Sequence, residues 1–136
     1  MTKQQICDAA RKCIGFKWRH QGRTATGMDC VGLLYAVANG CGVATENVTN
    51  YRHAPGSAPL VAELQKYCIE VERTERQPGD ILIVSIAGED PNHTMILTND
   101  NTVVHASARD RKVVEHRLDE KTENGICRVF RFKDVV

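Results

Sequence analysis

The sequence lacks an excess of charge of either sign. Its 18 Lys and Arg residues against 17 Asp and Glu residues give a formal net charge of +1 over 136 residues. A chain so close to neutral produces no large field that would attract a polyanion. We therefore do not expect nucleic acid to be its partner.

Long hydrophobic runs are also missing. The longest, around residues 81–87, is far shorter than the roughly 20 apolar residues of a transmembrane helix. The first residues, MTKQQICDAARKCIG, carry charges throughout and lack the apolar stretch of a signal peptide. We expect a protein that is made in the cytoplasm and does not insert into a membrane.

The six cysteines lack the spacings of a metal site. The sequence has no C-x-x-C pair and no Cys/His pair at zinc-finger spacing, so we expect no structural zinc. An even number of cysteines suggests disulfides in a short secreted chain, whereas cytosolic thiols stay reduced. A disulfide or zinc scaffold stays open as an alternative, and most of the thiols are expected to be small buried hydrophobes.

The length is that of one average domain, so we expect residues 1–136 to form a single one. Apolar positions at helical spacing predict helices from Thr2 to near Gly15, from Cys30 to Asn39-Gly40 and over residues 60–68. Five β-type runs follow, at residues 81–87, 93–98, 102–106, 112–117 and 126–132. Helices first and strands after predict an α+β fold, with N-terminal helices packed on a central antiparallel five- to six-stranded sheet that forms a meander.

Cys30 follows the stretch TGMD and opens the second predicted helix. Unpaired N–H groups and the helix dipole favour an anion in the first turn. Such a position can lower a thiol pKa from about 8.5 toward roughly 3.5–7.5, which makes Cys30 a candidate nucleophile. Cys30 is also the first member of the apolar stripe of this helix, and a buried structural cysteine is the alternative.

His93, Met95 and Leu97 share one face of their predicted strand, the face that we expect the helix stripe to cover. A histidine on such a face is either a hydrogen-bonded core residue or a base that serves Cys30.

The second histidine of this region, His105, lies on the following strand. If residues 99–101 form the loop, Met95 faces His105, and His93 lies diagonal to His105 on the same face. The two imidazoles can then touch, in the series nucleophile Cys30, base His93 and orienter His105. A loop of two residues would put the two histidines on opposite faces.

Three segments carry a resemblance to a known family. They are WRHQGRTATGMDCVGLL (18–34), QPGDILIV (77–84) and NHTMILTNDNTVVHAS (92–107). In this order they resemble the nucleophile block, the Pro-Gly-Asp turn before the first central strand, and the strand pair of the base in the NlpC-type cell-wall peptidases, which are papain-like. The string HQGR (20–23) and the stretch around Tyr51 are most similar to the phage tail-associated branch of this family.

The resemblance implies roles for the matching residues. Cys30 is the implied nucleophile, His93 the base and His105 the third member. Trp18 stands where many members have a Tyr thought to assist the oxyanion site, and its indole N–H or the Cys30 backbone N–H is left for that role. Further candidates for contacts with substrate are Asp29, Arg19, Arg23, Arg52 and Tyr51.

The implied reaction is hydrolysis of an amide bond in peptidoglycan stem peptides, of the D-γ-glutamyl-diamino acid type, through an acyl-enzyme thioester without metal or organic cofactor. A phage tail would deliver such an enzyme to the cell wall, with tail proteins as partners. Two alternatives stay open: a papain-like amidase or acyltransferase with another acyl substrate, and a structural tail assembly protein that keeps the fold.

Overall fold

The computed structural model describes residues 1–43, 45, 58–85 and 93–136. Its helices are α1 (Lys3–Arg11), α2 (Cys30–Gly40), α3 (Ala58–Tyr67) and α4 (Glu120–Asn124). Its strands are β1 (Arg23–Thr24), β2 (Gly27–Met28), β3 (Cys68–Val71), β4 (Ile81–Val84), β5 (His93–Leu97), β6 (Thr102–Ser107), β7 (Lys112–Arg117) and β8 (Ile126–Phe132). The predicted α+β class is confirmed.

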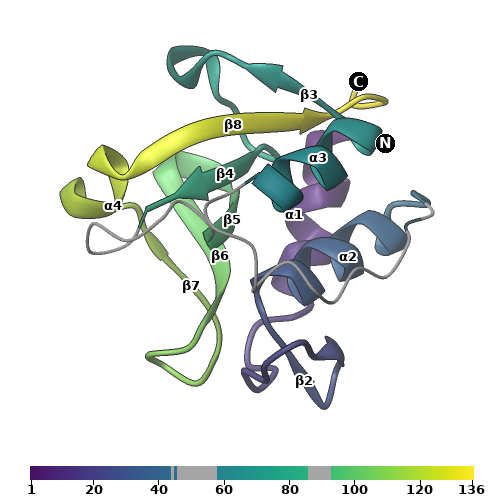
Figure 1. Cartoon of the computed structure of the whole chain (residues 1–136), viewed down its shortest axis with the longest axis vertical. Helices are drawn as coiled ribbons and strands as arrows, with labels where there is room; N and C mark the ends of the chain where they lie inside the picture. Colours follow the sequence, from purple (N-terminus) through teal and green to yellow (C-terminus); the bar gives the residue numbers. More distant parts are fainter. Residues whose placement is uncertain (44, 46–57, 86–92) are drawn as a thin grey trace.

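The main sheet has six strands in the order β3-β8-β4-β5-β6-β7, and every neighbouring pair is antiparallel. Strands β4 to β7 form the predicted meander. The prediction is wrong for β8, which returns to pair with β4 on its other side, and β3 then pairs with β8 as an edge strand (Figure 1). Placing β4 and β5 in the middle of the sheet buries both of their faces.

Helices α1, α2 and α3 lie together beside the sheet (Figure 1). Helix α1 begins with a capping box, in which the Thr2 hydroxyl accepts from the Gln5 N–H and the Gln5 side chain accepts from the Thr2 N–H. The main core joins apolar residues of the helices to Ile81, Ile96 and Val104 of the sheet. A smaller cluster on the opposite face contains Leu82, Val84, Met95, Leu97, Val103, Ile126 and Val129.

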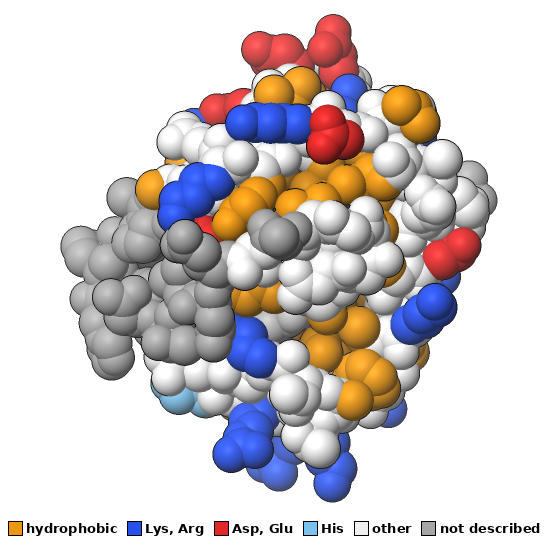
Figure 2. Space-filling model, turned by 90° about the vertical axis from the view of Figure 1, so that its right-hand side faces the viewer, with side chains coloured by type: hydrophobic (Ala, Val, Ile, Leu, Met, Phe, Trp, Pro, Cys, Tyr) orange, Lys and Arg blue, Asp and Glu red, His pale blue; other side chains and the backbone are white. Residues whose placement is uncertain are grey.

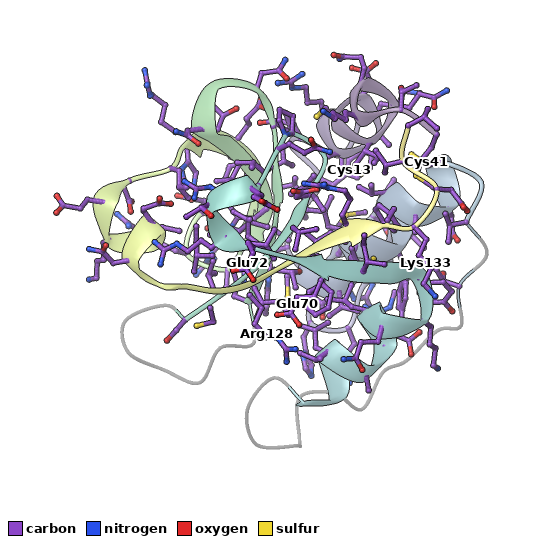
Figure 3. All side chains as sticks on the ribbon, turned by 90° about the horizontal axis from the view of Figure 1, so that it is seen from above. Cys13, Cys41, Glu70, Glu72, Arg128 and Lys133 are labelled. Atoms are coloured by element: carbon purple, nitrogen blue, oxygen red, sulfur yellow. The ribbon has the colours of Figure 1, made fainter. Side chains whose placement is uncertain are left out.

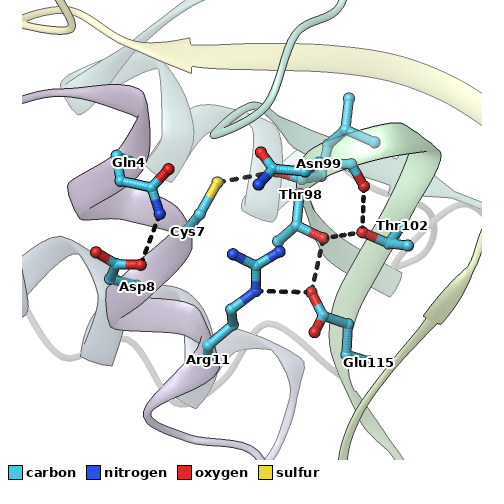
Figure 4. A network of polar contacts seen from close by, with 9 residues as sticks. Gln4, Cys7, Asp8, Arg11, Thr98, Asn99, Thr102 and Glu115 are labelled. Carbon is cyan, nitrogen blue, oxygen red and sulfur yellow. Dashed lines mark hydrogen bonds and ion pairs between the residues drawn. The ribbon is translucent and has the colours of Figure 1, made fainter.

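A polar network ties α1 to the turn between β5 and β6 (Figure 4). Arg11 forms an ion pair with Glu115 of β7 at 3.0 Å, and the same carboxylate accepts from the Thr98 hydroxyl at 2.9 Å. Thr98 and Thr102 bond to each other through their hydroxyls and their backbones. The network therefore holds the turn that sets how β5 and β6 pair.

Several elements were not predicted. Strands β1 and β2 form a small hairpin where only turns were expected, α4 lies in a predicted loop, and Cys68 begins β3 instead of ending the third helix. Edge strand β3 is linked to β8 by an ion pair between Glu70 and Arg128 (Figure 3). These segments are too short, or too polar, to show a clear period in the sequence.

The helix-bearing side shows hydrophobic side chains gathered in a band, with Lys and Arg gathered toward one end (Figure 2). None of the described helices is long and apolar enough to span a bilayer. All six cysteines lie in the described part of the chain, and all are free thiols.

Candidate active site

The start of α2 is built around the buried carboxylate of Asp29. As the N-cap residue, Asp29 accepts from the Gly32 N–H at 2.9 Å and from the Gln21 N–H at 2.9 Å. Arg23 adds an ion pair at 3.1 Å. Because a capping carboxylate satisfies helical N–H groups and complements the dipole, Asp29 fixes the first turn that carries Cys30.

Gly32 lets this turn pack against the preceding loop. A Cβ at Gly32 would lie 2.1 Å from the backbone oxygen of Gly22, far inside van der Waals contact. The glycine in the Asp29-Cys30-Val31-Gly32 string is therefore required by close packing of two backbone segments.

Cys30 lies at the first position of α2 and is half-buried against the main core. Its backbone carbonyl accepts a hydrogen bond from the Thr94 hydroxyl at 3.2 Å. Since Thr94 follows His93 directly, the start of α2 lies against the start of β5. Cys30 thus packs with the apolar stripe of α2 and lies next to the strand that carries His93.

His93 and His105 contact each other as the predicted register requires. Ile96 pairs with Val104 and Leu97 with Val103, and residues 99–101 form the turn. His93 Nε2 lies 2.9 Å from His105 Nδ1, and the ring planes are nearly perpendicular at 89°. The predicted pairing and the contact between the imidazoles are confirmed.

The predicted direction from which α2 approaches the histidines is wrong. The helix packs on the face of β5 that carries Ile96, whereas Met95 and Leu97 lie in the smaller cluster on the other face. The error arose because both faces of β5 are buried, so the strand has no single core face. Helix α2 therefore contacts β5 through the Thr94 hydroxyl, one residue from His93, on the face that carries Ile96.

Burial keeps both imidazoles neutral. Burial lowers the pKa of His93 to about 4, against an opposing effect of the nearby Asp29 carboxylate. The pKa of His105 is lowered to about 3, first by burial and then by His93 and His116. A neutral His93 can accept a proton from a thiol at neutral pH.

The remaining predicted residues have different surroundings. Trp18 forms a parallel backbone bridge with Met28, which places it beside the segment that leads to Cys30. Arg19 is exposed, whereas Arg23 is committed to Asp29 and also lies over the Tyr35 ring, 5.4 Å from its centroid. The predictions for Tyr51 and Arg52 fall outside the described residues.

Sequence reasoning missed His116 on β7. Its Nε2 lies 2.8 Å from His105 Nε2, so His116 adds a third histidine to the predicted pair. Val103 pairs with His116 and His105 with Val114, which puts His105 and His116 on the same face. The spacing of 102–107 and 112–117 could have shown this, had the second hairpin been given a register.

These side chains bridge one another and do not converge on a common point. Within the ranges that the structure describes, no group of three or more His, Cys, Asp or Glu side chains is arranged to hold a metal ion.

Fold and site together define a papain-like α+β domain with a cysteine at a helix start beside a histidine pair. The chain belongs to the NlpC/P60 family, whose model matches residues 15–128. No curated protein matches this chain.

Solved structures of this family share the fold. An NlpC/P60 family protein from Bacillus cereus superposes with a TM-score of 0.75 at 15% identity, over 97% of this chain and 40% of that one. The peptidoglycan hydrolase RipB from Mycobacterium tuberculosis gives 0.65 at 17% identity, over 95% of this chain and 63% of that one. The P60 domain of an M. avium subspecies paratuberculosis antigen gives a TM-score of 0.69 at 15% identity, over 95% of this chain and 93% of that one. The chain spans about two fifths of the first two structures that it matches, 40% and 41% of their lengths.

Proposed function

We propose that this chain is a cysteine peptidase that hydrolyses an amide bond in peptidoglycan stem peptides. The observation that carries the proposal is the His93–His105 hydrogen bond at 2.9 Å, on the strand that touches the start of α2 at Cys30. Membership of the NlpC/P60 family and the fold of a peptidoglycan hydrolase support it.

Cys30 is the proposed nucleophile and His93 the proposed base. His93 Nε2 is occupied by His105, which leaves Nδ1 to take the Cys30 proton. The thiolate attacks the amide carbon, a C–S bond forms, and the C–N bond breaks as His93 gives the proton to the leaving amine. Water, deprotonated by His93, then cleaves the thioester, and the proton returns to sulfur.

The start of α2 stabilises the charge that develops on the amide oxygen. The backbone N–H of Cys30 is the first of the helix, at the positive end of its dipole. Trp18 is the proposed aromatic neighbour of this oxyanion site.

The narrower proposals rest on the sequence resemblance. They are the D-γ-glutamyl-diamino acid bond as the bond cleaved, and a phage tail as the means by which an enzyme made in the cytoplasm reaches the wall. Asp29, Arg19 and Arg23 are the proposed residues around the substrate, with Arg23 acting through Asp29.

Hydrolysis of purified stem peptides, followed by mass spectrometry, tests the proposal. We expect cleavage at one amide bond, its loss in Cys30→Ala, and its retention in Cys127→Ala, which removes an exposed thiol elsewhere. Turnover of simple esters or lipids but not of stem peptides would favour the amidase or acyltransferase alternative. If Cys30→Ala leaves both wall penetration and particle assembly unchanged, the role is structural.

A further inference from the structure

Three histidines on neighbouring strands form an unbroken chain of hydrogen bonds. His93 Nε2 lies 2.9 Å from His105 Nδ1, and His105 Nε2 lies 2.8 Å from His116 Nε2. This series of hydrogen bonds ends at a backbone group, because His116 Nδ1 lies 2.8 Å from the carbonyl oxygen of Arg117. Both ring pairs are edge-on, with interplanar angles of 89° and 83°.

When all three rings are neutral, the Arg117 carbonyl at the end of this series of hydrogen bonds determines which nitrogen of each ring carries the proton. A carbonyl oxygen can only accept, so His116 must carry its proton on Nδ1. In a neutral ring Nε2 is then an acceptor, which requires His105 to donate from Nε2 and to accept at Nδ1. His93 must therefore donate from Nε2, and its Nδ1 is left as an unprotonated acceptor.

No other arrangement of three neutral rings makes all three hydrogen bonds. Burial holds His93 and His105 neutral, with pKa values of about 4 and 3. Each of these rings therefore has one donor and one acceptor, and a choice at one ring fixes the next.

We propose that His116 is a positioning residue, which uses the Arg117 carbonyl to fix the tautomer of His93 through His105. This inference deepens the proposed function and rests on it, since the nitrogen left unprotonated is the one that would take the Cys30 proton. The triad is thereby extended by one side chain and one backbone group.

A residue at position 116 that only packed would not affect which nitrogen of His93 carries the proton, whereas a positioning residue does. A side chain at position 116 that can only donate must reverse the direction of these hydrogen bonds. His105 then accepts at Nε2 and donates from Nδ1. His93 in turn accepts at Nε2 and is protonated on Nδ1. His93 would then have no lone pair for the thiol proton.

Nitrogen-15 NMR of the imidazoles in the full chain tests this claim. In the wild-type protein at neutral pH, we expect His93 and His105 to be protonated on Nε2 and His116 on Nδ1. His116→Gln, whose amide offers an acceptor to His105 and a donor to Arg117, should keep this pattern. His116→Arg, a permanent donor, should move the His93 proton to Nδ1, and His116→Leu should leave His93 as a mixture.

The rate at which iodoacetamide alkylates Cys30 gives a second readout. We expect a near wild-type rate in His116→Gln, a fall of at least about tenfold in His116→Arg, and an intermediate rate in His116→Leu, because only the fraction of His93 in the competent tautomer can take the proton. Amide spectra establish that each variant is folded.

Two results would overturn the proposal: wild-type His93 protonated on Nδ1, or folded Leu and Arg variants with unchanged tautomers and unchanged alkylation. If the Leu and Arg variants do not fold, the wild-type and Gln spectra decide alone. The tautomers can be measured without turnover, so the expected pattern in a protein that cleaves no stem peptide would refute the proposed function and leave the positioning role intact.

Discussion

His93 Nε2 lies 2.9 Å from His105 Nδ1, across two strands that the turn at residues 99–101 holds in one register. The hydrogen bond fixes the orientation of the His93 ring and does not use its Nδ1, which is the nitrogen proposed to accept the Cys30 proton. A shift of one residue in this pairing would place the two rings on opposite faces of the sheet. The register of one hairpin therefore determines whether the site can form.

Removing the orienting ring should slow the chemical step. We expect His105→Ala to lower kcat for stem-peptide hydrolysis by about a hundredfold or more with little change in KM, because His93 loses its orientation while the binding surface is kept. His105→Asn places an amide oxygen near the position of Nδ1 and should retain more activity than the Ala variant. Equal activity of the two variants and wild type would contradict the role of His105.

Adding a methyl group at Gly32 should disturb the start of α2. A Cβ there meets the Gly22 backbone at 2.1 Å, so we expect Gly32→Ala to destabilise the protein by about 1–3 kcal/mol in denaturant unfolding and to lower activity. Gly40→Ala is the matched control at the other end of the same helix, where the added Cβ would lie 3.5 Å from Ala9 Cβ. That variant should be neutral or slightly stabilising, and an equal loss in both would argue against the close contact.

Much of the fold was predictable because the apolar residues of α2, β7 and β8 have a clear spacing, and because turn-forming residues mark where these elements begin or end. The contact between His93 and His105 was predictable because one loop length fixed a register. The side on which α2 lies was not, since a strand buried on both faces does not show in its sequence which face meets a helix. His116 was missed because the partner of a strand depends on tertiary pairing, and β3 because four residues have no measurable period.

On acidification, the buried His93 and His105 should make this protein unfold at a higher pH than the protonation of its carboxylates alone would cause. The pKa values of His93 and His105 in the folded state, about 4 and about 3, lie below the unfolded value near 6.5. Between these values the unfolded chain binds more protons than the folded one, so stability is fully present above about pH 6.5 and is lost as the pH falls. We expect a loss on the order of 2 kcal/mol per histidine by pH 4.5 in urea unfolding. The double variant His93→Asn/His105→Asn should show a flatter profile, and a parallel one would refute this explanation.

Asp80, of the Pro-Gly-Asp turn, should contribute more to stability than Glu70 does. Both carboxylates pair with two nitrogens of an arginine, Asp80 with Arg131 at 2.8 and 2.9 Å and Glu70 with Arg128 at 2.9 and 2.6 Å. Asp80 is buried and also accepts from the Gln77 N–H, whereas the Glu70 pair is exposed.

Removing Asp80 takes away three hydrogen bonds to a charged group, because Arg131, which is 21% exposed, loses its carboxylate and the Gln77 N–H loses its acceptor. We therefore expect Asp80→Ala to cost about 1.5–3 kcal/mol and Glu70→Ala at most about 1 kcal/mol in thermal or denaturant unfolding. Similar losses in the two variants would show that burial does not distinguish these pairs.

The most direct test of the central claim is the rate at which iodoacetamide alkylates each of the six cysteines, measured by mass spectrometry of the native protein at neutral pH. We predict that Cys30 reacts much faster than the exposed Cys127, and that His93→Ala abolishes this preference while the variant stays folded. Equal reactivity of Cys30 and Cys127 in the wild-type protein, or a Cys30 rate unaffected by His93→Ala, would contradict a nucleophile activated by His93.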